Sequence, residues 1–425
     1  MSRLAFALAC LAGGLALAQP NTYFVPIAQR TVTPVVGANA MGTSIWLPDQ
    51  SVDPNQTLLF GVGSGSLEVF PVAAQGSGSI TNVPTQADAI ATAPGVLVQG
   101  VSKTLIAVLG NGAISLYTID DTGSGIQAFV PRNPASGPID AGTQIALSAV
   151  AGGRAALLVA DGFRITRFEI DMTGSQTVVT PGSSMSASPP GTTDQSNALV
   201  FDGINNIGFV GGRVLGDIYQ FDPRLDAGPP SAFDIALVSQ GRLAAPVTGF
   251  ALYSVTTATY LLAANNQGVT LYDLRSGTPV LGGIRIIPFD AVGPITGPAG
   301  VAVTNLPVGT GFPKGFFAVG DRTQTDLAEL RWDVLAGQVD GGLTIDTLFD
   351  PRVVFLPDSG LPDAGVDGGV SDGGSGGTPG GGGGGPVGPG IPVEHDSSCA
   401  TAAGTPVLLL LLGALGLLPR RRQRR

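Results

Sequence analysis

The sequence has 425 residues but only two cysteines and one histidine. Cys10 lies near the N-terminus and His395 and Cys399 near the C-terminus, so the segment from Gln19 to Phe355 contains neither residue type. This excludes disulfide bonds, zinc sites built from cysteine or histidine, cysteine nucleophiles and histidine general bases from that segment. Any chemistry there depends on carboxylates, hydroxyls, arginines or a bound hard cation.

Lysine is also scarce, because Lys103 and Lys314 are its only occurrences in the same segment. The segment holds 15 lysine and arginine residues against 25 aspartate and glutamate residues, which gives a net charge of −10. No basic face is therefore available for nucleic acid. Two interpretations of the acidic excess remain. It is either a solvated surface that favours solubility or a surface that repels polyanions unless cations intervene.

The N-terminus has the pattern of a secretory signal peptide. Arg3 precedes an apolar run, Leu4–Leu17, and Ala16-Leu17-Ala18 forms an A-x-A cleavage site. A lipoprotein signal that ends at Cys10 is the alternative, but only six residues separate Arg3 from Cys10. We therefore predict a signal peptide over residues 1–18, cleavage after Ala18, and an exported protein.

The C-terminus combines a cysteine, an apolar run and a basic cluster. The uncharged run from Thr401 to Leu418 would extend about 27 Å as a helix, close to the roughly 30 Å hydrocarbon core of a bilayer. Five arginines follow within residues 420–425 and favour a cytoplasmic location for that end. The segment 399–425 resembles the myxobacterial C-terminal sorting signal, which implies processing near Cys399 by a membrane protease of the myxosortase type. A plain membrane anchor is the alternative, and both place the body outside the cytoplasm. Sorting predicts the cell surface or outer membrane as the destination, with the chain membrane-anchored before processing.

Residues 356–398 are rich in glycine and proline and poor in apolar side chains, as in DAGVDGGVSDGGSGGTPGGGGGGPVGPG. Such a composition buries too little surface to offset the entropy of ordering the chain. We therefore predict a disordered, flexible linker with a reach of roughly 35 Å.

Six segments of the remaining body share one pattern, in which an apolar run, a turn rich in Gly, Asn or Asp, and a second run follow one another. They begin at Thr57, Thr104, Ala155, Ile207, Tyr260 and Gly315. Each predicts a β-hairpin whose first strand is packed on both faces and whose second strand alternates, as in RITRFEI. A period near 50 residues is typical of propeller blades. We predict an all-β, six-bladed β-propeller over residues 19–355, with a strand from Thr22–Val36 closing the last blade. A two-sheet sandwich is the alternative.

Two segments resemble the first and last blades of β-propeller phytases, namely TSIWLPDQSVDPNQTLLFGV from Thr43 and AGVAVTNLPVGTGFPKGFFAVGDR from Ala299. GFALYSV from Gly249 and YLLAANNQGVTLYD from Tyr260 follow the family order as well. The resemblance spans about Thr31 to Asp333. It implies a six-bladed propeller with a central cleft that holds calcium ions and hydrolyses phytate.

The positions that this resemblance expects to be acidic are mostly neutral here: Met41, Gly42, Pro246, Thr248, Asn265, Asn266, Gln267, Gly297 and Ala299, and Thr43 stands at its proline position. The phosphate-gripping turns read Gly63-Ser64-Gly65 and Gly110-Asn111-Gly112, without lysine or arginine. Asp202 and Asp321 are the best remaining candidate metal ligands. The alternative for each is a local backbone hydrogen-bond acceptor.

We therefore assign no catalytic residue. The sequence favours an exported, surface-tethered, phytase-like propeller that has lost or weakened its phosphatase activity. We expect this propeller to be a monomer that binds a partner or a ligand, such as a small phosphorylated compound. The alternative is an active calcium-dependent phosphoesterase of the 3-phytase type, a myo-inositol hexakisphosphate phosphohydrolase with calcium as its cofactor.

Overall fold

The structure is a computed structural model in which the chain divides into two units, Met1–Asp363 and Ala364–Arg425. All residues that it describes belong to the first unit: 21–26, 29–32, 42–47, 56–63, 66–72, 81–83, 87–119, 129–134, 139–140, 142–188, 195–213, 216–226, 228–234, 246–266, 268–275, 280–287, 295, 297–321, 326–339 and 343–350. The predicted signal peptide with Ala18, the linker and the tail with Cys399 lie outside these residues. Within them, no helix is long and apolar enough to cross a membrane.

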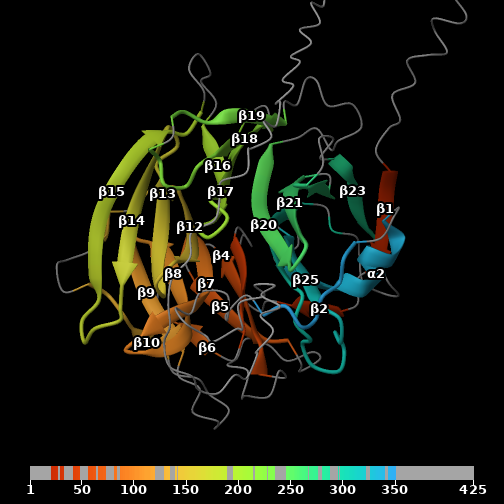
Figure 1. The fold of residues 1–425 in the computed structure, drawn as a ribbon. Helices are drawn as coiled ribbons and strands as arrows, with labels where there is room; N and C mark the ends of the chain where they lie inside the picture. The colour runs from red at the N-terminus through yellow and green to blue at the C-terminus, as the bar shows by residue number, and fades with distance from the viewer. Residues whose placement is uncertain are drawn as a thin grey trace, which may run out of the picture. The chain divides into compact units, whose positions relative to one another are not determined.

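The described residues form six β-sheets built mainly from consecutive strands (Figure 1). The first sheet contains β3 (Gly42–Trp46), β4 (Leu58–Gly63), β5 (Ser66–Pro71) and β6 (Thr81–Val83). The second contains β7 (Ala89–Val98), β8 (Val101–Gly110), β9 (Ala113–Ile119), β10 (Phe129–Pro131) and β11 (Ile139–Asp140). The third contains β12 (Gln144–Val150), β13 (Arg154–Ala160), β14 (Arg164–Asp171) and β15 (Val178–Ser186).

The other three sheets follow the same order along the chain. The fourth contains β16 (Ser196–Asp202), β17 (Ile207–Gly212), β18 (Ile218–Phe221) and β19 (Ser231–Asp234). The fifth contains β20 (Val247–Val255), β21 (Ala258–Asn265), β22 (Gly268–Asp273), β23 (Val280–Ile287) and β1 (Asn21–Pro26). The sixth contains β24 (Pro298–Thr304), β25 (Phe316–Asp321), β26 (Asp326–Arg331) and β2 (Gln29–Val32).

All six predicted hairpins are confirmed, and each forms the second and third strands of its sheet. β13 shows why the first run of each hairpin is continuously apolar. Ala155, Leu157 and Val159 pack toward the second sheet, whereas Ala156 and Leu158 pack toward the fourth. Because side chains alternate between the two faces of a strand, a strand buried on both faces must be apolar throughout.

The sheets close into a ring. We call the strands β3, β7, β12, β16, β20 and β24 the first strands. Each contacts the first strands of the two neighbouring sheets, and β24 of the sixth sheet returns to β3 of the first. The described residues thus form an all-β, propeller-like arrangement in which no sheet packs face to face with a single partner.

The hydrophobic core follows this ring, because six buried clusters lie between successive pairs of sheets. The cluster that joins the sixth sheet to the first contains Phe316 and Ala318 from β25 together with Leu59 from β4 and Phe70 from β5. A two-sheet sandwich would place its apolar faces around one shared core. The six separate clusters contradict that alternative.

The N-terminal strands complete two sheets. β2 pairs antiparallel with β26, so the predicted closure of the last sheet by a segment within Thr22–Val36 is confirmed. β1 pairs parallel with β23 as a fifth strand, which the sequence did not predict. Because β22 then lies in the middle of a five-stranded sheet, all six of its residues are buried, where alternation was expected.

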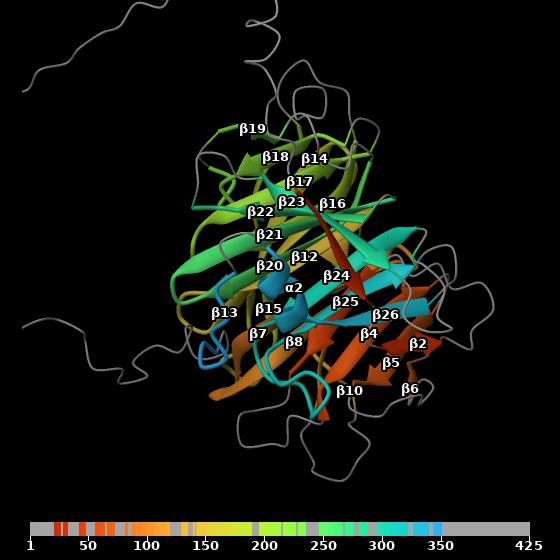
Figure 2. The same cartoon turned by 90° about the vertical axis from the view of Figure 1, so that its right-hand side faces the viewer.

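One short helix, α2 (Trp332–Gln338), follows β26 directly. Trp332, Leu335 and Ala336 are its buried residues, and they join the cluster between the fifth and sixth sheets. Trp332 packs against Tyr253, with ring centroids 4.2 Å apart. Figure 2 shows α2 beside these sheets, where it covers apolar side chains of β20 and β25.

Candidate functional site

A cavity of about 310 Å³ lies at the centre of the ring. All six first strands line it, through residues within 44–47, 90–94, 145–149, 199–205, 250–254 and 301–305. β7 contributes residues 90–94, from its first half, and the other five first strands contribute the middle or the C-terminal part of their length.

Two hydrogen bonds between neighbouring sheets show that β16, β20 and β24 begin at the same end of the ring. Near the starts of their strands, Asn197 Nδ2 donates to the carbonyl oxygen of Val247, and Thr248 Oγ1 donates to that of Pro298 at 2.9 Å. We call the end of the ring at which the first strands begin the leading rim. The opposite end, at which they finish, is the trailing rim.

The cavity wall is mainly apolar. Its larger apolar side chains are Ile45, Leu47, Ile90, Leu147, Leu199, Phe201, Phe250, Leu252, Val301 and Val303. No lysine, arginine or histidine is among the described lining residues, and Asp202 is the one carboxylate among them. Ligand pockets typically combine such apolar walls with a few polar groups that fix orientation.

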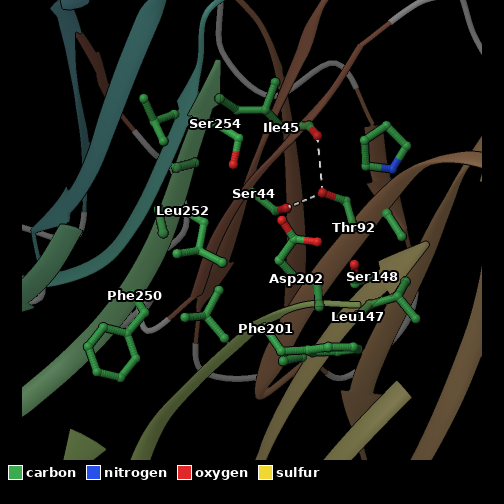
Figure 3. A pocket seen from close by; sticks show the side chains of 18 of the residues that line it. Ser44, Ile45, Thr92, Leu147, Ser148, Phe201, Asp202, Phe250, Leu252 and Ser254 are labelled. Atoms are coloured by element: carbon green, nitrogen blue, oxygen red, sulfur yellow. Dashed lines mark hydrogen bonds between the residues drawn. The ribbon is translucent and has the colours of Figure 1, made fainter. Parts of the chain in front are cut away.

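The polar groups of the cavity come from strands that are distant in sequence. The hydroxyls of Ser44 on β3 and Thr92 on β7 lie 2.7 Å apart, and Thr92 Oγ1 donates to the carbonyl oxygen of Ile45 at 3.2 Å. Ser148 Oγ on β12 donates to the carbonyl oxygen of Ala149 and accepts from the backbone N–H of Gly203, each at 3.0 Å. Figure 3 shows these hydroxyls and the Asp202 carboxylate in the same region of the cavity.

Asp202 ends β16 at the trailing rim and closes a turn there. Its Oδ1 accepts from the backbone N–H groups of Ile204 at 2.9 Å and Asn205 at 3.1 Å, and its Oδ2 accepts from Asn205 Nδ2 at 2.6 Å. This is the local acceptor role that the sequence left open as an alternative to metal binding. The side chain is half-buried and also lines the cavity, so the turn fixes a carboxylate at this position.

Residues 343–350, which we call the C-terminal strap, reach the cavity at the trailing rim. Asn305, which is buried, donates through Nδ2 to the carbonyl oxygens of Asp346, at 2.6 Å, and Phe349. Asp346 accepts from Thr256 Oγ1 at 2.7 Å, and this hydrogen bond holds the pKa of Asp346 below its ordinary value. Phe349 lines the cavity.

Tyr253 fixes the strap from the other side. Its hydroxyl donates to the carbonyl oxygen of Thr344 at 3.3 Å. Burial raises the pKa of Tyr253 above its ordinary value, so the phenol stays neutral and serves as a hydrogen-bond donor. The strap therefore forms a fixed part of the trailing rim.

Asp321 lies at the other end of the ring. It is fully buried at the end of β25, where it is paired in register with Pro298, the first residue of β24. Thr304, at the end of β24, lines the cavity, and six residues of strand span about 20 Å. Asp202 and Asp321 thus lie at opposite rims and do not form one site. Across the described residues, no group of three or more His, Cys, Asp or Glu side chains is placed to hold a metal ion.

The neutral residues that replace the expected carboxylates gather at the leading rim with Asp321. Gly42 begins β3, and Thr248 and Ala299 are the second residues of β20 and β24. Calcium prefers six to eight oxygen ligands that include carboxylates. The described residues of the leading rim therefore do not fit the calcium cluster that the resemblance implied, whereas Met41 and Gln267 lie outside the described residues.

Ser44, Thr92 and Ser148 were not predicted from the sequence as site residues. Their signal was a hydroxyl within a short apolar strand, as in TSIW, IATA and IALSAV. That pattern is common in buried strands, so only the ring reveals that these hydroxyls meet.

Comparisons with known proteins add fold-level similarity. No protein-family model matches the chain, and no curated protein does. Among solved structures, the chain is similar to the calcium-binding protein regucalcin from Agrobacterium tumefaciens, at 12% identity and a TM-score of 0.40, over 72% of this chain and 95% of that chain. An auxiliary nutrient binding protein from Bacteroides thetaiotaomicron shows 12% identity, a TM-score of 0.40 and 69% coverage of each chain. BBS1N, from a complex with ARL6DN soaked with lead, shows 12% identity and a TM-score of 0.38 over 64% of this chain and 74% of that chain.

Proposed function

We propose that this chain is a six-bladed β-propeller of phytase-like ancestry that binds a small, mainly apolar ligand in its axial cavity and does not hydrolyse phosphate esters. The six sheets and the six clusters between them support the blade number. One observation carries the functional part. The cavity wall consists of apolar side chains and hydroxyls, with a single carboxylate and no cationic side chain among its described residues.

A phosphorylated ligand does not suit this wall. Phosphate groups are recognised by arginine, lysine, metal ions or clusters of backbone N–H groups. Here an anion would meet the Asp202 carboxylate and apolar side chains in a region of low dielectric, where like charges repel strongly. A small apolar molecule would instead remove its own surface and that of the wall from water, at about 25 cal/mol per Å².

The proposal also includes the cellular location of the propeller. We propose that the chain is exported after cleavage at Ala18, processed near Cys399 by a sorting protease, and tethered at the cell surface or outer membrane as a monomer. The patterns at the two ends of the sequence support this setting. A binding domain on a long linker would meet ligands outside the cell.

The experiment that tests the function measures phosphate release from phytate by the purified protein, with millimolar Ca²⁺ and with a chelator. We expect no calcium-dependent release and no rise in melting temperature with Ca²⁺. Free calcium at 100 times the dissociation constant of a site would stabilise the protein by about 2.7 kcal/mol. Calcium-dependent phosphate release, or a clear calcium-induced rise in melting temperature, would overturn the proposal in favour of the phosphoesterase.

A further inference from the structure

The hydrogen bonds that the cavity hydroxyls already make restrict the chemical class of ligand that the cavity can bind. This inference rests on the proposed binding function. Thr92 Oγ1 uses its proton on the carbonyl oxygen of Ile45, so the short contact between the two hydroxyls makes Ser44 Oγ the donor to Thr92. A hydroxyl has one proton and two acceptor positions. Ser44 therefore keeps acceptor positions but has no proton left for a ligand.

Ser148 is in the same condition. Its proton is used on the carbonyl oxygen of Ala149, and one of its two acceptor positions takes the N–H of Gly203. One acceptor position remains. The three hydroxyls thus present oxygen lone pairs to the cavity, and their protons are already engaged with the protein.

Asp202 adds a negative charge to this set of acceptors. Oδ1 accepts two backbone hydrogen bonds, whereas Oδ2 accepts one, from Asn205 Nδ2, and so keeps an acceptor position. Within the described part of the chain Asp202 forms no ion pair, and no cationic side chain lines the cavity with it. A cation that enters the cavity would be attracted to this carboxylate more strongly than in bulk water.

The size and shape of the cavity limit the rest of the ligand. A volume of about 310 Å³ lies at the lower end of the range for small-molecule sites, which indicates a small ligand. Phe201, Phe250 and Leu252 supply apolar surface on the wall (Figure 3). An ammonium group has three donors and no acceptor, which complements the cluster of these three hydroxyls and Asp202, where every hydroxyl proton is already engaged.

We infer that the axial cavity binds a small primary amine whose ammonium group is held by Asp202, Ser44 and Ser148 and whose apolar body packs against the phenylalanines. The class is a small aralkyl or branched alkyl amine.

Calorimetric titration of the purified full-length protein with three matched probes tests this inference. The probes are 2-phenylethylamine, the neutral 2-phenylethanol and the anionic 3-phenylpropanoate. We expect the amine to bind about 10- to 100-fold more tightly than the alcohol, the range for one hydrogen bond to a charged group. The acid should bind more weakly than the alcohol.

Asp202→Asn removes the charge while the new amide oxygen still accepts from the backbone N–H groups of the turn, where asparagine is well tolerated. This variant should lose the preference for the amine and keep its affinity for the alcohol. Asp161→Asn is the matched control, because Asp161 Oδ1 also accepts two backbone N–H groups, at 3.2 and 2.8 Å, but does not line the cavity. It should leave all three affinities unchanged.

Each outcome has a distinct meaning. If the alcohol or the acid binds the wild-type protein as tightly as the amine, the ammonium inference is overturned and the binding function stands. If none of the probes binds at millimolar concentration, both are overturned. If Asp202→Asn fails to fold, the three probes are titrated into the wild type and Ser44→Ala instead. Ser44→Ala is expected to weaken the binding of the amine alone, and this result tests the ammonium inference. Phosphate release from phytate would overturn the proposed function even with the amine bound.

Discussion

Gly249 offers a direct test of how neighbouring sheets meet around the cavity. It lies in β20, and a Cβ atom added to it would stand 2.7 Å from the carbonyl oxygen of Ala299 and 3.1 Å from the Cα of Gly300, both in β24. Ordinary van der Waals contact begins at 3.4 Å, so the approach is short by about 0.7 Å. The obstacle is backbone and cannot rotate away. Gly249→Ala must therefore push the fifth and sixth sheets apart.

The expected cost follows from measured overpacking. Forcing one extra methyl into a well-packed contact destabilises a protein by typically 1–3 kcal/mol. For the roughly 245 residues that the structure describes, the entropy of unfolding is about 0.5 kcal/mol per degree, so the melting temperature should fall by about 2–6 °C. β20 and β24 also line the cavity, through Leu252 and Val303 among others. The affinity for 2-phenylethylamine should fall together with the melting temperature.

Differential scanning calorimetry of the wild type, Gly249→Ala and Gly174→Ala provides the measurement. Gly174 has open space around it and no positive φ, so its alanine variant controls for the loss of glycine flexibility. We expect Gly174→Ala to melt at or slightly above the wild-type temperature. If Gly249→Ala melts within half a degree of Gly174→Ala, β20 and β24 are not in contact at this point. That result would contradict the closed ring of sheets.

The hairpins could be predicted from the sequence because their signals are local. An apolar run, a tight turn and an alternating run specify two paired strands without reference to the rest of the chain. β14 shows this well, since its sequence RITRFEI places Ile165 and Arg167 on one side and Thr166 and Phe168 on the other, in register with β13. The spacing near 50 residues then indicated the ring, because no single sheet buries both of its faces alone.

Pairings between distant segments had no such signal. β1 meets β23 across about 260 residues of sequence, whereas β2, a few residues later, closes the sixth sheet. The cavity was missed for a related reason. Ser44, Thr92 and Ser148 are about 50 residues apart in sequence, and only the closed ring brings them together. The phytase resemblance predicted ligand positions at the leading rim, whereas the candidate cavity extends to the trailing rim.

Three further predictions concern other parts of the chain. Asp273 accepts two hydrogen bonds from Arg275 Nε and Nη2, at 2.9 and 2.7 Å, and these hold its pKa below the ordinary value. This contribution to stability is present above the unfolded pKa near 4 and is lost as the pH falls through the lower folded pKa. Asp273→Asn should therefore cost up to about 1 kcal/mol at pH 7. It should also flatten the decline of the urea unfolding midpoint between pH 4 and 2, and an unchanged decline would contradict this. Gly337→Ala in α2 meets no neighbour within 4 Å and should raise the melting temperature, because alanine is the better helix former by up to about 1 kcal/mol; a lower melting temperature by calorimetry would contradict it. The last prediction concerns Cys399, where the sequence predicts processing. Cys399→Ala should leave an uncleaved precursor in the inner membrane, because the apolar run stays intact and the arginines that follow it resist translocation. Mass spectrometry of the surface protein measures the outcome: the wild type should end near Cys399, and a wild-type C-terminus that extends to Arg425 would establish a plain membrane anchor instead.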